Sequence, residues 1–240
     1  MSVFALLLLA ELAAGDTTAA AAPIENDFPV VLGSYATTLI GSLPKRTANI
    51  RLATAALDGT VLEPGTVLSF NATVGPRTVE RGYQIAPVIL REERQLQTGG
   101  GICQAASTLF CAALLSGLTV VERHRHSSPV DYIALGEDAT IAWSFSDLKI
   151  QNDLDQRVRL RIGVLGSTLA ARFEGERPLE AGFELATDDR EVPEASDDHL
   201  PGREIELYRV RCVDGQEVDR EFIHRDLYPS VRAREPAGRR

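Results

Sequence analysis

The sequence predicts an α+β fold in which a mainly antiparallel sheet packs against two helices. Residues 47–57 and 105–116 have the apolar spacing of helices with one buried face. Several short runs alternate apolar and polar residues or end at glycine turns, which is typical of antiparallel strands. A chain of 240 residues with 44% hydrophobic residues can bury the core of one domain of ordinary size.

The first half of the chain is predicted to place short strands around the first helix. Strands are expected at residues 30–32, 67–70 and 85–90. Thr47 can cap the first helix, and Asp58 and Gly59 end it, because glycine tolerates a left-handed backbone. The loop at 71–83, between two of these strands, is long enough to carry functional residues.

The second half is predicted to begin with the second helix and to continue mostly as strands. Strands are expected at 118–121, 139–143, 148–151, 157–164 and 168–173. Gly166 and Ser167 are expected to turn the last two of these into a hairpin. Residues 204–223 can form another hairpin across Asp214 and Gly215, a dipeptide typical of tight hairpin turns.

The distribution of charge excludes one class of function and divides the chain. The net charge is −9, whereas a general nucleic-acid binder needs a basic face, so no nucleic-acid partner is expected. Most of the charge lies in residues 174–200, which contain ten acidic residues and two arginines. We therefore expect a signal or disordered segment at 1–28, a folded domain at 29–177, an acidic linker or loop at 178–202, a C-terminal hairpin extension at 203–229 and a basic tail at 230–240.

The N-terminus has the features of a weak signal peptide. Residues 3–10 are apolar and small residues at 19–22 suit a signal peptidase, although Glu11 interrupts the run and no Lys or Arg precedes it. We expect export, with a cytoplasmic location as the alternative. No other stretch reaches the roughly 18 apolar residues of a membrane span, so no stable span is expected in the mature chain.

The three cysteines are not expected to form a disulfide framework. Cys103 and Cys111 lie in one predicted helix, roughly 12 Å apart along its axis, which is beyond the reach of a disulfide. Cys111 could pair only with Cys212, and small buried hydrophobic residues are the simpler interpretation of both. The sequence has no C-x-x-C pair, so neither a metal site nor another cofactor is expected.

Cys103 is the candidate nucleophile. It follows Gly99, Gly100 and Gly101 and begins the second helix, whose N-terminal partial positive charge lowers the pKa of a cysteine. Glycines let the backbone approach a substrate closely, and free N–H groups around Gly100 and Gly101 could bind an oxyanion. The side chain of Gln104 is a further candidate donor to that oxyanion.

A histidine and an acid follow in the order found in cysteine hydrolases of the papain type. His126 is preferred over His124 as the partner of the thiol, because the strand that begins at 118–121 leads into the histidines and His126 lies nearer its end. Asp138 and Asp147 are the acids that could orient its ring, and Asp138 is marginally preferred. An unreactive cysteine in an ordinary helix is the alternative to this arrangement.

The remaining candidate site residues have two interpretations each. Arg123 could bind a substrate carboxylate or pair with an acid of the protein. Tyr83 and Tyr132 could line a pocket, or they could pack in the core or at its rim. Ser127, which follows His126, completes the group of candidate substrate-binding residues.

Several different short motifs are distributed along residues 29–175, and together they resemble one known family. The motifs are Asn49, Asp58–Gly59, Pro64–Gly65, Ser69–Asn71, Val74–Gly75, Gly82–Tyr83, Gly99–Gln104, Ser107–Leu109, Glu122–Arg123, His126–Ser127, Tyr132, Gly136, Asp138–Thr140, Asp147–Leu148 and Asn152. They resemble the VanW family, for which the run GGGICQ at 99–104 is highly specific.

The resemblance implies a role at the bacterial cell wall. The family is named for an accessory protein of some vancomycin-resistance gene clusters, and its members are often exported or membrane-anchored. Some VanW domains are linked to L,D-transpeptidation, which cross-links peptidoglycan stems through a cysteine acyl-enzyme. By position, the resemblance implies Cys103 as nucleophile, His126 as its partner, peptidoglycan stem peptides as binding partners and a location in the cell envelope.

Three functions are compatible with these observations. The leading one is cysteine-dependent acyl transfer on peptidoglycan stem peptides, although the motif around Cys103 differs from the Ser-His-Gly-Cys signature of ordinary L,D-transpeptidases. The second is a non-catalytic peptidoglycan-binding or accessory module related to glycopeptide resistance. The third is a cysteine amidase or peptidase that only hydrolyses, since acceptor choice depends on how the site excludes water.

Overall fold

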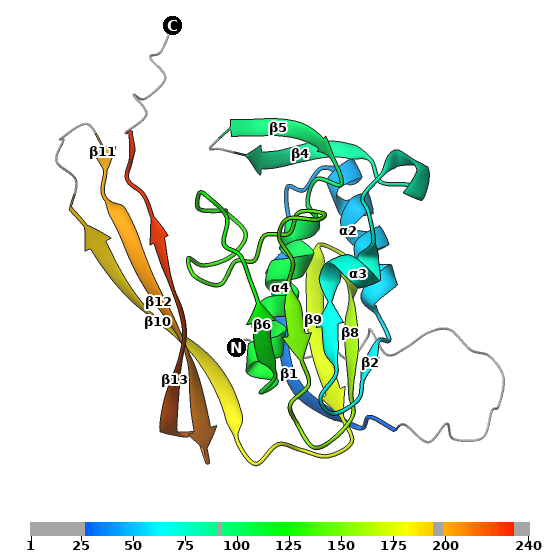
Figure 1. Ribbon diagram of the computed structural model, residues 1–240, viewed down its shortest axis with the longest axis vertical. Coiled ribbons are helices and arrows are strands. Elements are labelled where there is room, and N and C mark those ends of the chain that lie inside the picture. The colour runs from blue at the N-terminus through cyan, green and yellow to red at the C-terminus, as the bar shows by residue number, and fades with distance from the viewer. Residues whose placement is uncertain (1–26, 91–92, 194–198, 233–240) are drawn as a thin grey trace, which may run out of the picture.

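The computed structural model describes residues 27–90, 93–193 and 199–232 and has the expected α+β fold, with antiparallel sheets around two long helices (Figure 1). Nearly all of the predicted signal segment and residues 233–240 of the predicted basic tail lie outside the described residues. Within the described ranges, no helix is both long and apolar enough to cross a membrane.

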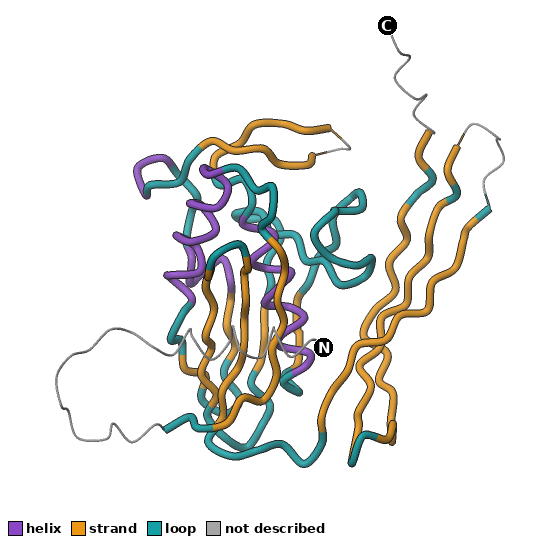
Figure 2. The backbone as a smooth tube through the Cα atoms, turned by 180° about the vertical axis from the view of Figure 1, so that it is seen from behind, coloured by secondary structure: helices purple, strands orange, loops and turns teal. Residues whose placement is uncertain are grey.

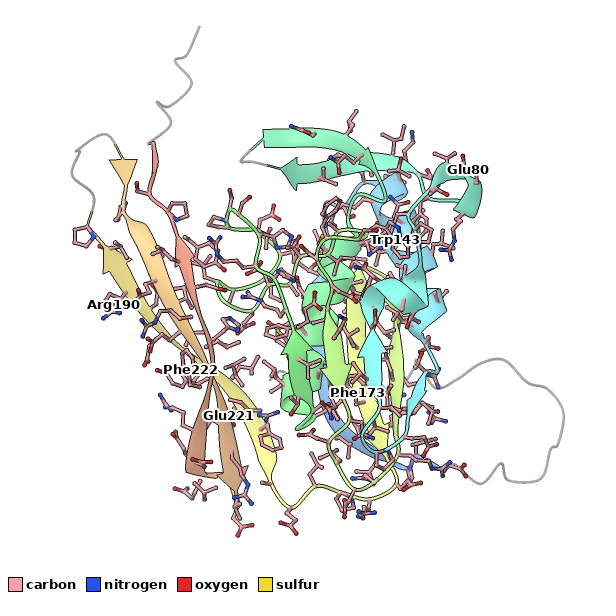
Figure 3. All side chains as sticks on the ribbon, in the orientation of Figure 1. Glu80, Trp143, Phe173, Arg190, Glu221 and Phe222 are labelled. Carbon is pink, nitrogen blue, oxygen red and sulfur yellow. The ribbon has the colours of Figure 1, made fainter. Side chains whose placement is uncertain are left out.

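The main sheet has four strands, all antiparallel to their neighbours. Their order is β1 (Val30–Thr38), β9 (Thr168–Gly175), β8 (Val158–Leu165) and β2 (Val61–Leu62). β8 and β9 form the predicted hairpin across Gly166 and Ser167. Along β8 the buried residues alternate with half-buried ones, as its sequence predicted, and Phe173 of β9 lies inside the core (Figure 3).

Two helices pack against this sheet (Figure 2). The first, α2 (Pro44–Leu57), contacts β8 and ends at Asp58 as predicted, although it begins three residues before Thr47. The second, α4 (Ile102–Leu115), contacts β1 and β9, and nearly all of its residues are buried. A helix that is apolar on almost every side is stable only when it is surrounded, so α4 forms the centre of the core.

Smaller elements frame the ends of the two helices. A three-stranded sheet has the order β3 (Val67–Ser69), β7 (Lys149–Gln151) and β6 (Thr119–Glu122). The predicted loop at 71–83 contains most of the short helix α3 (Phe70–Val74) and the 3-10 turn η1 (Val79–Arg81). The strand β4 (Ile85–Leu90) is as predicted, and it pairs with β5 (Glu93–Thr98), which the sequence analysis missed.

The predicted strand at 139–143 is wrong. This segment is a loop with one isolated bridge between Ala142 and Ser146. Its backbone N–H groups bond outside any sheet, since Ala139 donates to the Ser107 hydroxyl and Thr140 donates to the His124 carbonyl. A segment with the composition of a strand is therefore a loop, and its backbone hydrogen bonds fix it beside α4.

The predicted acidic linker at 178–202 is also wrong for most of its length. Residues 182–192 form β10 (Gly182–Val192), the edge strand of a sheet in the order β10, β12 (Gly202–Val213) and β13 (Gln216–Tyr228). Ion pairs join the two strands: Arg203 of β12 pairs with Asp189 of β10 and offsets part of its acidic charge, and Arg190 of β10 pairs with Glu204 of β12. The two-residue strands β11 (His199–Leu200) and β14 (Val231–Arg232) extend this region.

The C-terminal hairpin across Asp214 and Gly215 is as predicted, with both residues at positive φ. Its sheet stands beside the main domain in Figure 1 and packs against it through apolar side chains. Leu207 of β12 is fully buried in the same core cluster as α4, and Leu185 and Ile223 pack on that cluster. The hairpin extension is thus one part of a three-stranded sheet that shares the core of the domain.

Candidate active site

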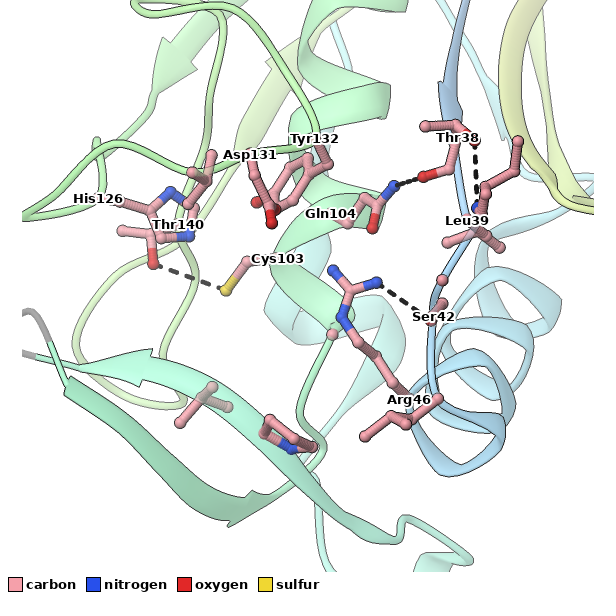
Figure 4. A pocket seen from close by; sticks show the side chains of 17 residues that line it. Thr38, Leu39, Ser42, Arg46, Cys103, Gln104, His126, Asp131, Tyr132 and Thr140 are labelled. Carbon is pink, nitrogen blue, oxygen red and sulfur yellow. Dashed lines mark hydrogen bonds between the residues drawn. The ribbon is translucent and has the colours of Figure 1, made fainter. Parts of the chain in front are cut away.

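Cys103 lies at the start of α4 and faces a pocket. It is the second residue of the helix, after the N-cap Gly101, whose φ is 103°. The residue is partly exposed, and its Sγ atom lies 3.6 Å from the Thr140 hydroxyl and 3.7 Å from the Ile141 carbonyl oxygen. The pocket beside it has a volume of about 330 Å³ (Figure 4). A small substrate or one end of a peptide can therefore approach the thiol.

Segments far apart in the sequence line this pocket. They are the end of β1 with the start of α2, strand β4, the first residues of α4, the loop after β6 and the loop that holds Thr140. The lining residues are Thr38, Leu39, Ile40, Gly41, Ser42, Leu43, Arg46, Pro87, Val88, Gly101, Cys103, Gln104, His126, Val130, Asp131, Tyr132 and Thr140.

His126 is the histidine that lies in the pocket with the thiol. It belongs to the loop after β6, lines the same pocket as Cys103 and acts electrostatically on that thiol. Its ring packs edge-on against Tyr132, with ring centroids 6.4 Å apart. His124, the alternative considered from sequence, is exposed and bonds with Glu122 at 3.0 Å instead. The structure thus brings together Cys103 and His126.

Asp138 holds the ring and the backbone of His126 with one oxygen. Its Oδ2 accepts hydrogen bonds from His126 Nδ1 at 2.6 Å and from the His126 backbone N–H at 2.7 Å. Because Nδ1 is bound to the acid, Nε2 is the ring nitrogen that remains for the thiol. Asp147, the other acid considered, accepts from the Ser69 hydroxyl and the Asn71 backbone N–H and does not reach this histidine.

The other oxygen of Asp138 is held by residues from two directions. Arg123 donates to Oδ1 at 3.1 Å, and the Tyr228 hydroxyl donates to it at 2.8 Å. Arg123 also binds Asp226 at 2.7 Å and is itself buried. Of the two interpretations of Arg123, the structure shows pairing with acids of the protein, and this side chain does not line the pocket.

This hydrogen-bonded chain shifts the pKa of each member. Burial raises the pKa of the Cys103 thiol, but the hydrogen bond and the charge of His126 outweigh burial and lower it to about 7. Burial lowers the pKa of His126, yet its bonds with Asp138 and Cys103 raise it to about 9. Burial raises the pKa of Asp138, while the bonds from His126 and the charge of Arg123 lower it to about 2. Near neutral pH these shifts favour a thiolate beside an imidazolium.

The glycines before Cys103 make close contacts with the protein itself. A Cβ atom at Gly100 would lie 2.5 Å from the Ala86 carbonyl oxygen, and one at Gly101 would lie 2.4 Å from Arg46 Cγ. Gly100 does not line the pocket, whereas Gly101 does. The run therefore lets the start of α4 pack tightly against β4 and α2.

The side chain of Gln104 has a spare acceptor, not the spare donor that the sequence predicted. Its amide nitrogen donates to the Thr37 hydroxyl at 3.0 Å and to the Thr38 carbonyl at 2.8 Å, which uses both amide hydrogens. It is therefore not free to donate to an oxyanion. Its Oε1 atom is buried and has no hydrogen-bond partner among the described residues.

The remaining predicted site residues divide between pocket and core. Tyr132 lines the pocket, and its ring carries the guanidinium of Arg46 at 5.7 Å. Tyr83 is buried in the hydrophobic core, and Ser127 is exposed outside the pocket. All three cysteines are free; Cys111 is a buried core residue, as expected, whereas Cys212 is only half-buried and lies outside the core cluster. Among the described residues, no group of three or more His, Cys, Asp or Glu side chains is arranged to hold a metal ion.

Sequence analysis did not single out Arg46, Thr140, Asp226 or Tyr228 for the site. Thr140 could have been found from its place two residues after Asp138. No comparable signal marked Arg46 or Tyr228, because the first lies at the start of a different helix and the second lies 90 residues after the acid that it contacts. Only the fold brings them to the thiol and its acid.

Comparison with known proteins adds the family. The model of the VanW-like protein family matches residues 45–173, more than half of the chain. YoaR of Bacillus subtilis, an uncharacterized protein, is 40% identical over 138 residues, which cover 58% of this chain and 46% of YoaR. The vancomycin B-type resistance protein VanW of Enterococcus faecalis is 23% identical over 181 residues, which cover 73% of this chain and 66% of that protein.

The alignment with YoaR thus spans about half of that relative, and no solved structure matches the chain. The residues matched by the family model contain Cys103, His126 and Asp138, but they end before the strand that carries Tyr228. The family match confirms the resemblance that the GGGICQ run indicated. The chain belongs to the VanW family.

Proposed function

We propose that this protein is a cysteine acyltransferase that acts on peptidoglycan stem peptides in the bacterial cell envelope, in the manner of an L,D-transpeptidase. The observation that supports this most directly is the placement of Cys103 and His126 in one pocket, where His126 lowers the pKa of the thiol and is itself held by Asp138. One relative is a vancomycin resistance protein, and vancomycin acts on the cell wall, which agrees with a stem-peptide substrate.

In the first half of the proposed reaction, the Cys103 thiolate attacks the carbonyl carbon of a peptide bond and a C–S bond forms. The C–N bond then breaks, and His126 gives its proton to the departing amine. The product is a thioester between the enzyme and the acyl part of the peptide. The pKa of about 9 for His126 means that it carries this proton at neutral pH.

In the second half, an amine of another stem attacks the thioester and His126 takes its proton. The C–S bond breaks and the thiolate is restored, so the cycle consumes no cofactor. If water attacks instead, the same residues carry out hydrolysis. The acceptor alone separates the transferase from the amidase.

The backbone at the start of α4 can bind the oxyanion of the tetrahedral intermediates. The N–H of Ile102 bonds to the Gly99 carbonyl, and that of Gln104 bonds to the Gly101 carbonyl at 3.0 Å. The N–H of Cys103 lies between them, in the first turn, where a helix offers no acceptor of its own. We assign the oxyanion to this group, with the partial positive charge of the helix N-terminus behind it.

The direct test is incubation with purified muropeptides, followed by mass spectrometry. We expect cross-linked dimers and a transient acyl adduct on Cys103, and Cys103→Ala should abolish both. Cys212→Ser is the matched control, because Cys212 lies on the C-terminal hairpin outside the pocket. Trimmed monomers alone would indicate hydrolysis. Bound but unchanged muropeptides, with no adduct, would contradict catalysis and favour the non-catalytic module.

A further inference from the structure

Arg46 places in the pocket a positive charge that forms no ion pair with the described residues. It lies in the first turn of α2, and its Nη1 donates to the Ser42 hydroxyl at 3.3 Å. None of the ion pairs among the described residues includes Arg46, although most other arginines there pair with an acid. Within this part of the chain, Arg46 therefore lacks the carboxylate partner that a half-buried guanidinium normally has.

The surroundings of Arg46 remove water from it without placing a carboxylate from the described part of the chain at ion-pair distance. Burial lowers the pKa of Arg46, while nearby Tyr132, Asp131 and Cys103 act in the opposite direction. Its guanidinium lies over the ring of Tyr132, which restricts its motion and shields one face. Asp131 is the acid among the lining residues, but it is exposed and forms no ion pair with Arg46. A guanidinium in this setting favours an incoming anion, and a carboxylate can match its two parallel N–H groups.

Arg46 packs against the backbone of Gly101, directly before the helix turn that carries Cys103. A Cβ atom at Gly101 would lie 2.4 Å from Arg46 Cγ and 3.3 Å from the Arg46 carbonyl oxygen. Only glycine at 101 leaves room for the arginine stem to run past the start of α4. The stem of Arg46 thus packs against Gly101, two residues before Cys103, and this packing fixes the guanidinium beside the start of α4.

Gln104 supplies an independent sign of a missing ligand. Its side chain is fully buried, its amide nitrogen is held by Thr37 and Thr38, and its Oε1 atom has no partner among the described residues. Buried acceptors are almost always hydrogen-bonded, so this oxygen is ready to accept an N–H group from a molecule in the pocket. Figure 4 shows Gln104 and Arg46 on the side of Cys103 away from His126.

We propose that the pocket binds the C-terminal residue of a peptide with a free carboxylate. Arg46 binds the carboxylate, and Gln104 Oε1 accepts the amide N–H of the same residue. This inference rests on the proposed function and deepens it: the bond that is cleaved is the last peptide bond of the stem, and the leaving group is a single amino acid. Peptides whose C-terminus is blocked or extended are poor donors.

Binding to a Cys103→Ala protein tests this site without relying on catalysis. The probes are a synthetic stem tetrapeptide that ends in D-alanine, as the free acid and as the carboxamide, and the measurement is isothermal titration calorimetry. We expect the free acid to bind at least about tenfold more tightly. Equal binding of the two peptides, or no measurable binding of either, would overturn the proposal.

Variants at position 46 assign the preference to one side chain. In the Cys103→Ala background, Arg46→Gln should bind the free acid only as well as the carboxamide, and Arg46→Lys should keep part of the preference. Lys45→Gln is the matched control, because Lys45 is exposed on the same helix turn and does not line the pocket. Thermal unfolding of each variant separates loss of binding from loss of folding. A full preference for the free acid in Arg46→Gln would refute the assignment.

An ester analogue, in which oxygen replaces the last amide N–H, tests Gln104. It should bind several-fold more weakly than the amide peptide, and equal binding would remove Gln104 from the site. The failure of the proposed function has a different signature. A carboxylate preference with neither turnover nor adduct in the wild-type protein would leave a peptide-terminus binding site without acyl transfer.

Discussion

Removing the imidazole of His126 should make Cys103 a poor nucleophile at neutral pH. Burial by itself raises the pKa of this thiol, and the hydrogen bond and charge of His126 bring it down to about 7. In His126→Ala, burial still raises the pKa of the thiol, and only the weaker bonds with Ile141 and Thr140 still lower it. We therefore expect a pKa of 9 or above. At pH 7 the thiolate fraction would fall from about one half to about 1%, roughly a 50-fold decrease.

The assay is the rate of iodoacetamide alkylation at each cysteine between pH 5 and 10, resolved by peptide mass spectrometry. The wild-type rate at Cys103 should rise with a midpoint near 7, and that of His126→Ala with a midpoint at least two pH units higher. His124→Ala is the matched control, since His124 is exposed and binds Glu122. Cys111 is the unreactive internal reference, because burial raises its pKa. An unchanged midpoint in His126→Ala would refute the thiolate–imidazolium pair.

Three further predictions concern the groups around this pair. Tyr228→Phe removes a 2.8 Å hydrogen bond to a buried carboxylate, which should cost about 1.5–3 kcal/mol in urea unfolding. Because the less satisfied Asp138 then favours the imidazolium of His126 more strongly, the alkylation midpoint should also move downward; a purely structural role would leave the midpoint in place. Burial would raise the pKa of Asp138, but the bonds from the neighbouring imidazole lower it to about 2, so its stabilisation is present above about pH 5 and is lost as the pH falls through 2. We expect the free energy of unfolding to fall by about 2.5 kcal/mol between about pH 5 and about pH 1, and Asp138→Asn to flatten this dependence; parallel curves would contradict it. Gly101→Ala combines a φ of 103° with a 2.4 Å clash against Arg46 and should cost at least about 2 kcal/mol, whereas Gly166→Ala, at φ 57° in open space, should cost about 1 kcal/mol; equal losses in thermal unfolding would argue against the close packing.

Local sequence patterns predicted the parts of the fold that depend on local physics. The apolar run that became α4 predicted a buried helix, and the Asp214–Gly215 dipeptide predicted its hairpin turn, because each depends on residues close in the chain. The prediction of an acidic linker is wrong because strand pairing decides this segment: β10 pairs with β12 along its whole length, and Arg203 of β12 pairs with Asp189. Charge counted along the chain does not reveal such pairing.

The candidate site divides along the same line. Cys103, His126 and Asp138 follow one another within 36 residues, and their order favoured this group, although it left Asp147 as an alternative to Asp138. Arg46 and Tyr228 lie outside that interval. Their roles could be predicted only from a three-dimensional structure, because only the fold brings them to the site. Gln104 shows a different limit, because its residue type does not reveal which end of the amide is already used.

The C-terminal sheet has a consequence for how far the family domain can be treated as a module. Asp226 and Tyr228 of β13 complete the shell around Arg123 and Asp138, yet both lie beyond the residues that the family model matches. A fragment trimmed to the shared domain would retain the sulfur and the imidazole while leaving a buried guanidinium short of one counter-charge and opening the Leu207 face to water. Transplanting the candidate site residues into another scaffold would therefore require the C-terminal sheet to be transferred with them.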